Sequence, residues 1–280
     1  MSLKSIKPKK SLGQNFLIDK NIAQKTISLL DIKENDIIVE IGPGTGALTS
    51  LILERYSNPL IAVEIDHRAI EDLTQKFPKS VYKGFFLLHK DFRNFHFEDI
   101  KNILDFEVDN RTLKVIGNIP YYLSSEILFS LFESNLKINR AVMTIQKELA
   151  QRLVAKPASK DYGILTVALN MNAQCKIEFD VPPPCFYPPP NVMSSVINIT
   201  FFENRQEHYS KLMKLVRVSF NQRRKMISNS LKSEISYIIS DELSIDDRNR
   251  LNALITQRPE RLLVEDFVFL HKLISNSKQK

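Results

Sequence analysis

Short apolar runs recur between residues 37 and 145, and stretches with helical periodicity separate them. Buried strands are predicted by the runs at 37–41, 60–63, 85–89, 113–117 and 139–145. Helices are predicted at 20–30, after the N-cap residue Asp19, and at 47–55, 68–77, 146–155 and 163–170. Strands that alternate with helices in this way predict an α/β fold with a parallel sheet.

The pattern changes after residue 170. Segments 174–181 and 192–202 alternate polar and apolar residues, which predicts an antiparallel pair of strands. Between them, segment 182–190 holds six prolines, so it cannot be a central strand. We expect a stiff, extended loop that presents the rings of Phe186 and Tyr187.

A polar stretch at 203–210 predicts a domain boundary. Segment 211–232, beyond it, has helical apolar positions and no Asp or Glu, and its basic residues are Lys211, Lys214, Arg217, Arg223, Arg224, Lys225 and Lys232. A basic face without acids favours binding to a phosphate backbone. We expect residues 1–205 to form the first domain, with 1–18 as an N-terminal arm, and residues 206–280 to form a helical, basic domain.

Polar residues follow four successive predicted strands. Segment 40–46, with its glycines, lies at the end of the first, Glu64 ends the second, Asp91 and Phe92 follow the third, and Asn118 ends the fourth. Ligands of open α/β sheets bind across these strand ends, where a glycine loop approaches the ligand and an acid accepts from ribose hydroxyls. With Asp91 as acceptor for an adenine amine, the series predicts an adenosine-containing ligand. The glycine loop has no Walker lysine, which argues against a nucleotide phosphate.

The segment Asn118-Ile119-Pro120-Tyr121 is an unusual exit from a strand. Proline fixes its own backbone and keeps the preceding residue extended, so carbonyl groups and the Asn118 amide can face a ligand. Acceptors beside the ring of Tyr121 suit a planar base with an exocyclic amine, and Phe186 could form a second plate. A plain strand-to-helix turn with a packed tyrosine is the alternative for this segment.

Composition narrows the class of protein. The chain has 280 residues, of which 43% are hydrophobic and 25% charged, and a net charge of +7. It has no apolar run long enough to span a membrane, and its basic N-terminus is no secretory signal. Two cysteines make no disulfide framework and indicate a cytoplasmic protein. Because we find no metal-binding or nucleophile motif, the chemistry should belong to a bound cofactor.

Five segments together resemble the ribosomal RNA adenine dimethyltransferases, most closely the small-subunit type linked to kasugamycin sensitivity. They are 12–17, 40–46, 118–121, 186–192 and 220–225. The resemblance covers nearly the whole chain. It implies a class I, Rossmann-like methyltransferase with a seven-stranded, mostly parallel sheet and a small all-α C-terminal domain that binds RNA. It also implies S-adenosylmethionine as cofactor, with S-adenosylhomocysteine as product.

The family's site residues carry over by motif. Expected cofactor contacts are Asn15, Leu17, Gly42, Gly44, Glu64, Ile65, Asp91, Phe92 and Asn118; expected catalytic residues are Asn118, Pro120, Tyr121 and Phe186; expected RNA contacts are Arg223, Arg224 and Lys225. The implied reaction dimethylates two adjacent adenines in the 3′-terminal hairpin loop of small-subunit (16S) rRNA. The implied partner is the assembling 30S particle, and the protein is expected to act as a monomer. Asn191 and Met193 stand where the family has Lys and Asp.

Three alternatives stay open from the sequence. The large-subunit (23S) dimethyltransferases of macrolide resistance share nearly all these motifs. DNA adenine and glutamine methyltransferases use similar Asn-Pro-Pro-Tyr motifs, although Ile119 and the basic C-terminal domain argue against them. A non-catalytic RNA-binding assembly factor, or a transcription factor of this fold, would bind cofactor without turnover. Retention of Glu64, Asn118 and Tyr121 favours an enzyme.

Overall fold

The chain forms two compact units. The computed structural model describes residues 6–104, 111–204, 208–238 and 243–277. The first unit comprises 1–150 with 173–203, and the second comprises 151–172 with 204–280. The expected boundary between residues 205 and 206 lies outside the described residues. Segment 151–172 was expected in the first domain, and this is corrected: its buried Tyr162 donates a hydrogen bond to the carbonyl of Leu262, at 2.7 Å.

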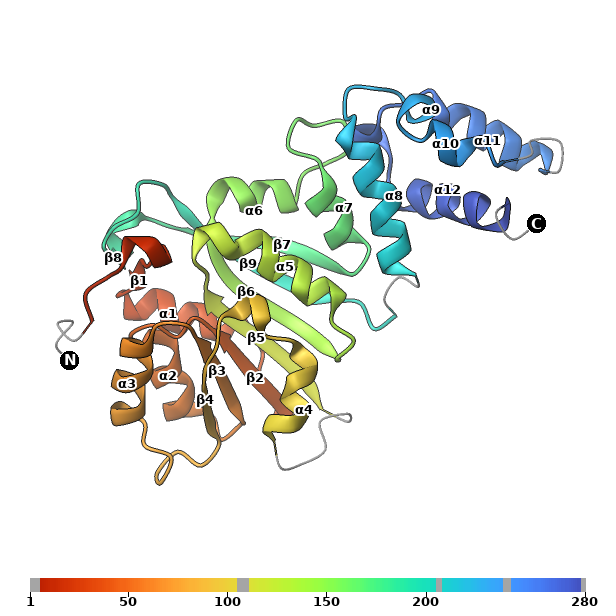
Figure 1. Cartoon of the computed structure of the whole chain (residues 1–280). Coiled ribbons are helices and arrows are strands. Elements are labelled where there is room, and N and C mark those ends of the chain that lie inside the picture. The colour runs from red at the N-terminus through yellow and green to blue at the C-terminus, as the bar shows by residue number, and fades with distance from the viewer. Residues whose placement is uncertain (1–5, 105–110, 205–207, 239–242, 278–280) are drawn as a thin grey trace. The chain divides into compact units, whose positions relative to one another are not determined.

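A seven-stranded sheet forms the centre of the first unit (Figure 1). Its spatial order is β4 (Phe85–His89), β3 (Leu60–Glu64), β2 (Asp36–Ile41), β5 (Thr112–Asn118), β6 (Ile138–Gln146), β9 (Ser194–Phe201) and β7 (Ala173–Val181). The first five strands run parallel, and β9 is antiparallel to both of its neighbours. The predicted mostly parallel α/β sheet is confirmed. Because the chain order reverses between β2 and β5, the ligand site is expected at the carboxyl ends of these strands.

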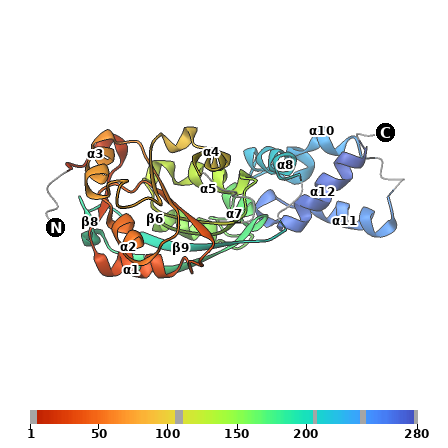
Figure 2. The same cartoon turned by 90° about the horizontal axis from the view of Figure 1, so that it is seen from below.

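Helices lie on both faces of this sheet. They are α1 (Lys20–Ser28), α2 (Ala47–Arg55), α3 (His67–Lys76), α4 (Ile100–Ile103), α5 (Ser124–Glu133) and the start of α6 (Lys147–Leu153). Figure 2 shows α1 on the opposite side of the sheet from α4 and α5. Asp19 begins α1 as predicted, since its side chain accepts from the backbone N–H groups of Asn21 and Ile22.

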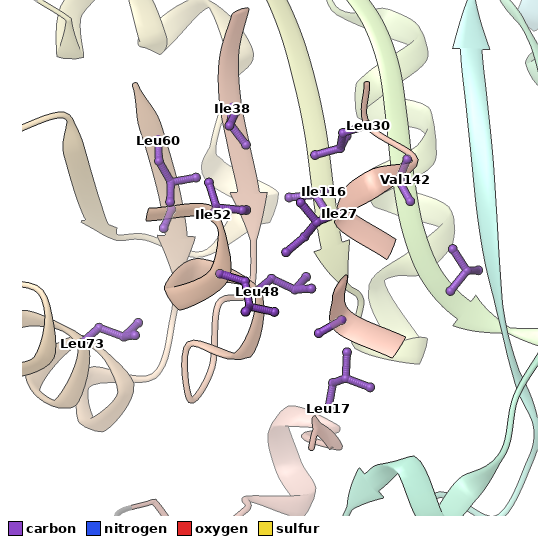
Figure 3. Close-up of a cluster of buried hydrophobic side chains, with 14 of the residues drawn as sticks. Leu17, Ile27, Leu30, Ile38, Leu48, Ile52, Leu60, Leu73, Ile116 and Val142 are labelled. Atoms are coloured by element: carbon purple, nitrogen blue, oxygen red, sulfur yellow. The ribbon is translucent and has the colours of Figure 1, made fainter. Parts of the chain in front are cut away.

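The main core lies between the sheet and α1 to α3. Because side chains alternate across a strand, every second residue of the buried strands points to this face. Figure 3 shows Ile38, Leu60 and Ile116 pointing toward Ile27 of α1 and Ile52 of α2. The adjacent strand residues, such as Val39 and Val115, are also fully buried. Burial on both faces explains why the strands read as continuous apolar runs.

A small second sheet ties the N-terminal arm to the proline-rich loop. Strand β1 (Phe16–Leu17) pairs antiparallel with β8 (Phe186–Tyr187), and the two lie side by side in Figure 1. The pairing joins segments that are far apart in the sequence. Two-residue strands leave no periodic signal, so this sheet was not predicted.

The second unit is helical. It contains α7 (Ile164–Asn170), α8 (Tyr209–Asn221), α9 (Ile227–Ser230), α10 (Lys232–Ile235), α11 (Ile245–Ile255) and α12 (Val264–Ser277). Phe220 of α8 packs between Tyr162 and Phe267, with ring centroids 6.4 Å and 6.1 Å away. The basic segment predicted as helix is interrupted at Asn221, so Arg224 and Lys225 lie on a turn.

Short 3₁₀ turns connect these elements. In the described residues they are Lys10–Leu12, Phe92–Asn94, Phe97–Asp99, Tyr121–Leu123, Pro183–Cys185 and Pro259–Arg261. Among the helices of the described residues, none has the length and apolar character needed to cross a membrane.

Candidate active site

An open pocket lies at the carboxyl ends of β2, β3 and β5 in the first unit. It encloses about 920 Å³, including the space at its mouth. The structure brings eleven of the expected residues to its wall: Asn15, Leu17, Gly42, Gly44, Glu64, Ile65, Asp91, Phe92, Asn118, Pro120 and Tyr121. These residues come from the N-terminal arm and from the loops after four strands, as the strand-end series predicted.

The glycine loop is held to the second strand by Glu64. One carboxylate oxygen of Glu64 accepts from the backbone N–H of Gly44, at 3.0 Å. The other accepts from the N–H groups of Ile65 and Asp66, at 2.9 Å and 2.8 Å. Gly44 has a φ of +55°, and a Cβ there would lie 2.9 Å from the ring of Phe16. The turn therefore requires glycine both for its backbone conformation and for the close approach of the arm.

A second carboxyl group lies in the wall beneath the glycine loop. Glu40 is only 1% exposed and accepts from the Thr49 hydroxyl, at 2.8 Å. Burial raises the pKa of Glu40 to about 7, and the nearby charge of Glu64 adds to the rise. Burial also raises the pKa of Glu64. Two buried acids in one pocket favour a ligand that carries positive charge. The sequence showed Glu40 inside a strand but gave no sign of this role.

Replacing Glu40 with Gln is expected to stabilise the protein above neutral pH. The pKa of Glu40 is raised from 4.5 to about 7, so the folded state binds this proton more tightly than the unfolded state. The stability it contributes is present below pH 4.5 and is lost as pH rises through 7. The variant avoids that loss of stability. The loss reaches about 3 kcal/mol, because each tenfold change in proton affinity corresponds to about 1.4 kcal/mol.

Urea unfolding of both proteins between pH 5 and pH 8 tests this expectation. The stability difference between variant and wild type should grow with pH and level off above about 7. A difference that is the same at every pH would contradict the assignment.

Asp91, the expected adenine acceptor, already has an arginine partner. Arg93 donates from Nε and Nη2 to the Asp91 carboxylate, at 3.0 Å and 2.6 Å. The Arg93 hydrogen bonds lower the pKa of Asp91, so its carboxylate is ionised and fixed in orientation at neutral pH. Phe92, the next residue, is buried and lines the pocket. The sequence reasoning missed Arg93, although it stands two residues after the acid.

Asn118 is oriented by the N-terminal arm. Its Nδ2 donates to the backbone carbonyl of Asn15, at 2.7 Å, which leaves Oδ1 to accept from a ligand. The hydroxyl of Tyr121 forms a 2.7 Å hydrogen bond with Ser194 Oγ, which fixes the tyrosine ring to β9. The Pro120 carbonyl accepts from the N–H of Leu123, at 3.0 Å. The segment after β5 is therefore held at both ends.

Phe186, which the sequence placed as a second plate opposite Tyr121, does not line the pocket. It is 2% exposed, belongs to the main core and is absent from the pocket wall. The pairing of β8 with β1 sets Phe186 opposite Leu17, and strand alternation then turns Tyr187 outward, where it is 49% exposed. A buried ring offers no face to a ligand in this structure, and the role of Phe186 as a second plate stays a prediction. The exposed ring at the pocket wall is Tyr122, at 52%.

The three expected RNA-binding residues divide into two kinds. Arg223 donates to the Glu260 carboxylate at 2.8 Å and to the Lys160 carbonyl at 2.7 Å, so it links parts of the second unit. Arg224 and Lys225 are exposed on the turn after α8. Of the three expected residues, these two combine a positive charge with an exposed position.

Comparisons with known proteins point to one family. The family model described as "Ribosomal RNA adenine dimethylase" matches residues 5–261. The chain is 39% identical over 271 residues to "Ribosomal RNA small subunit methyltransferase A" of Francisella tularensis subsp. tularensis, covering 96% of this chain and 98% of that protein. It is 36% identical over 268 residues to the protein of the same name from Lachnoclostridium phytofermentans, covering 95% and 91%.

Two solved structures share the fold. A dimethyladenosine transferase from Plasmodium falciparum has a TM-score of 0.75 at 22% identity, covering 94% of this chain and 98% of that chain. The 23S rRNA methyltransferase ErmE has a TM-score of 0.65 at 20% identity, covering 93% and 100%.

Proposed function

Since this chain belongs to the ribosomal RNA adenine dimethylase family, we propose that it dimethylates the N6 amines of two adjacent adenines in the 3′-terminal hairpin loop of small-subunit rRNA. The curated relatives at 36% and 39% identity, which are named as small-subunit methyltransferases, support this choice of RNA. The observation that carries the chemistry is the orientation of Asn118, whose amide donates to the arm and leaves its oxygen facing a substrate.

The pocket fits S-adenosylmethionine, the cofactor on which this enzyme depends. When bound, the cofactor supplies an electrophilic methyl group on a positively charged sulfur. Glu40 and Glu64, at 1% and 6% exposure, give the pocket the negative character that suits a cation. We assign Glu64 to the ribose, Asp91 to the adenine amine, and Asn15, Leu17 and the glycine loop to the remaining contacts.

The reacting group is an adenine amine, a weak nucleophile because its lone pair is delocalised into the ring. Asn118 Oδ1 accepts from one amine hydrogen. Since the Pro120 carbonyl accepts from both the Leu123 N–H and the Ser124 hydroxyl, we assign the Ile119 carbonyl to the other hydrogen. Two acceptors favour a pyramidal nitrogen whose lone pair is available, and Tyr121 supports the ring. Positioning and electrostatics then provide the rate, and the acidic ammonium product loses its proton readily.

The target adenine must leave its stack to reach this pocket. With Phe186 buried, we assign the faces of the flipped base to Tyr121 and to the exposed ring of Tyr122. The protein is proposed to act as a monomer on the assembling small subunit in the cytoplasm.

Identification of the product nucleoside tests the proposed reaction. The protein, the cofactor and small subunits that lack the modification are incubated, and the digested RNA is analysed by mass spectrometry. N6,N6-dimethyladenosine is the expected end product, with the monomethyl form as an intermediate. Methylation of another base, or of a ring nitrogen, would contradict the role given to Asn118.

Arg224 and Lys225 are expected to contact RNA phosphates. Replacing both with Ala should weaken RNA binding and reduce the slope of log affinity against log salt by about 2, roughly one for each lost phosphate contact. Replacing Arg223 with Ala should instead destabilise the second unit, because it breaks the hydrogen bonds to Glu260 and the Lys160 carbonyl. Filter binding at salt concentrations from about 50 to about 300 mM measures the slope. Thermal unfolding measures the loss of stability in Arg223→Ala. A slope that stays unchanged in the double variant would remove Arg224 and Lys225 from the interface.

A further inference from the structure

The N-terminal arm crosses the pocket and contacts both of its ends. At the glycine-loop end, the ring of Phe16 lies against Gly44. At the other end, a Cβ added to Gly13 would lie 3.1 Å from the ring of Tyr122. Between these contacts, the Asn15 carbonyl accepts from the Asn118 amide at 2.7 Å. Residues 12–17 of the arm form part of the pocket wall, so a ligand in the pocket lies against the arm.

A buried carboxylate outside the pocket wall holds the arm in this position. Asp66 is 3% exposed, and its Oδ2 accepts from Gln14 Nε2 at 2.8 Å. Gln14 Oε1 accepts in turn from the N–H of Lys9, also at 2.8 Å. Arg68 donates from Nε to Asp66 at 3.0 Å and from Nη1 to the Lys7 carbonyl at 2.8 Å. The Lys9 ammonium lies 3.9 Å from Asp66, so Lys7, Lys9 and Gln14 each tie the arm to the start of α3.

The hydrogen bond between Gln14 and Asp66 acts as a latch for the arm. This latch shares a turn with Glu64, the acid assigned to the cofactor ribose. The N–H of Asp66 donates to Glu64 at 2.8 Å, so the backbone that positions one carboxylate also positions the other. Burial acts to raise the pKa of Asp66, but the hydrogen bonds from Arg68 and Gln14 outweigh it and bring the pKa to about 2. The latch therefore keeps its charge throughout the physiological pH range.

We propose that Gln14 and Asp66 are positioning residues that hold the arm closed over the cofactor and thereby orient the amide of Asn118. The latch sets how long the cofactor stays bound, because release requires the Gln14–Asp66 hydrogen bond to break. It also sets the rate of methyl transfer, because the Asn15 carbonyl reaches Asn118 only from the closed arm. The effect on rate rests on the proposed function, whereas the effect on cofactor release does not.

Gln14→Ala and Asp66→Asn are expected to speed cofactor dissociation by about ten- to hundredfold, the usual effect of losing a buried hydrogen bond to a charged group. Asp66 does not line the pocket, so its effect must pass through the arm or its turn. Asn also serves well as a helix N-cap, so α3 should keep its start. Gln14→Glu should release the cofactor faster than Gln14→Ala, since it sets a second carboxylate against Asp66. Combining Gln14→Glu with Asp66→Asn should recover binding, because an amide and a carboxylate again face each other.

The measurements are the dissociation rate of S-adenosylhomocysteine and the rate of tryptic cleavage within the arm, both on the full chain. Gln75→Ala, an exposed change on α3, is the matched control and should match wild type in both. Cleavage should be faster in the latch variants when no cofactor is present. On RNA, kcat at saturating cofactor should fall together with affinity.

Two results would overturn the latch. One is wild-type dissociation and cleavage in both Gln14 variants. The other is failure of the swapped pair to improve on Gln14→Glu. If the variants release cofactor faster as expected but wild type does not methylate small-subunit RNA, the latch stands and the proposed function fails.

Discussion

Replacing Asn118 with Ala is expected to lower the rate of methyl transfer by about 10²- to 10³-fold, the usual loss when one well-placed polar group at a reacting centre is removed. The variant loses the oxygen proposed to accept from the amine, and it also loses the hydrogen bond to the Asn15 carbonyl. RNA binding should stay nearly intact, because Asn118 lies in the pocket rather than on the basic turn. Single-turnover methyl transfer at saturating cofactor and RNA measures the effect.

Two variants control this experiment. Asn118→Asp keeps an acceptor but sets a carboxylate against the Asn15 carbonyl, so it should retain more activity than Ala and less than wild type. Asn21→Ala removes an exposed amide on α1 and should behave as wild type. Full activity in Asn118→Ala would show that the amine is not activated by this residue.

Replacing Gly117 with Ala is expected to produce the largest loss of stability, about 1–3 kcal/mol or more, as overpacking in a tight core does. A Cβ there would lie 2.6 Å from the carbonyl oxygen of Ile41 and 2.7 Å from Cδ1 of Ile119. Ile41 is the pairing partner of Gly117 across β2 and β5, so the contact cannot relax without moving backbone. Such a shift would also move Asn118, the next residue, and reduce methyl transfer.

Gly163→Ala is the matched control for Gly117. It makes the same chemical change, but a Cβ at Gly163 would meet nothing within 4 Å. Its φ of −166° is extended backbone that alanine also adopts. Denaturant unfolding should show a clear loss for Gly117→Ala and little change for Gly163→Ala. Equal stability of the two variants would mean that β2 and β5 can move apart at Gly117 without a loss of stability.

The parts of the site that follow strands were predictable from the sequence. A strand buried on both faces gives a continuous apolar run, and the polar residue that ends the run marks the edge where ligands bind. Glu64, Asp91 and Asn118 were found in this way, and all three line one pocket. The antiparallel pairing of segments 174–181 and 192–202 followed from their alternation of polar and apolar residues.

Contacts between distant segments were not predictable, because no periodic pattern records them. The Gln14–Asp66 hydrogen bond joins residues 52 positions apart in the sequence. The β1–β8 pairing buries Phe186, whereas its place in a proline-rich loop suggested an exposed ring. Arg223 was read as one of three equal basic residues, whereas its partner Glu260 comes from a later turn.

The most direct test of the central claim compares two RNAs as acceptors of labelled methyl groups from S-adenosylmethionine. Unmethylated small ribosomal subunits and naked large-subunit RNA are incubated in parallel with wild-type protein and with Asn118→Ala. Label is expected in the 3′-terminal hairpin of the small-subunit RNA, as dimethyladenosine, and only when the wild-type protein is present. Label confined to the large-subunit RNA, or no label in either RNA while the protein still binds the cofactor, would contradict this expectation.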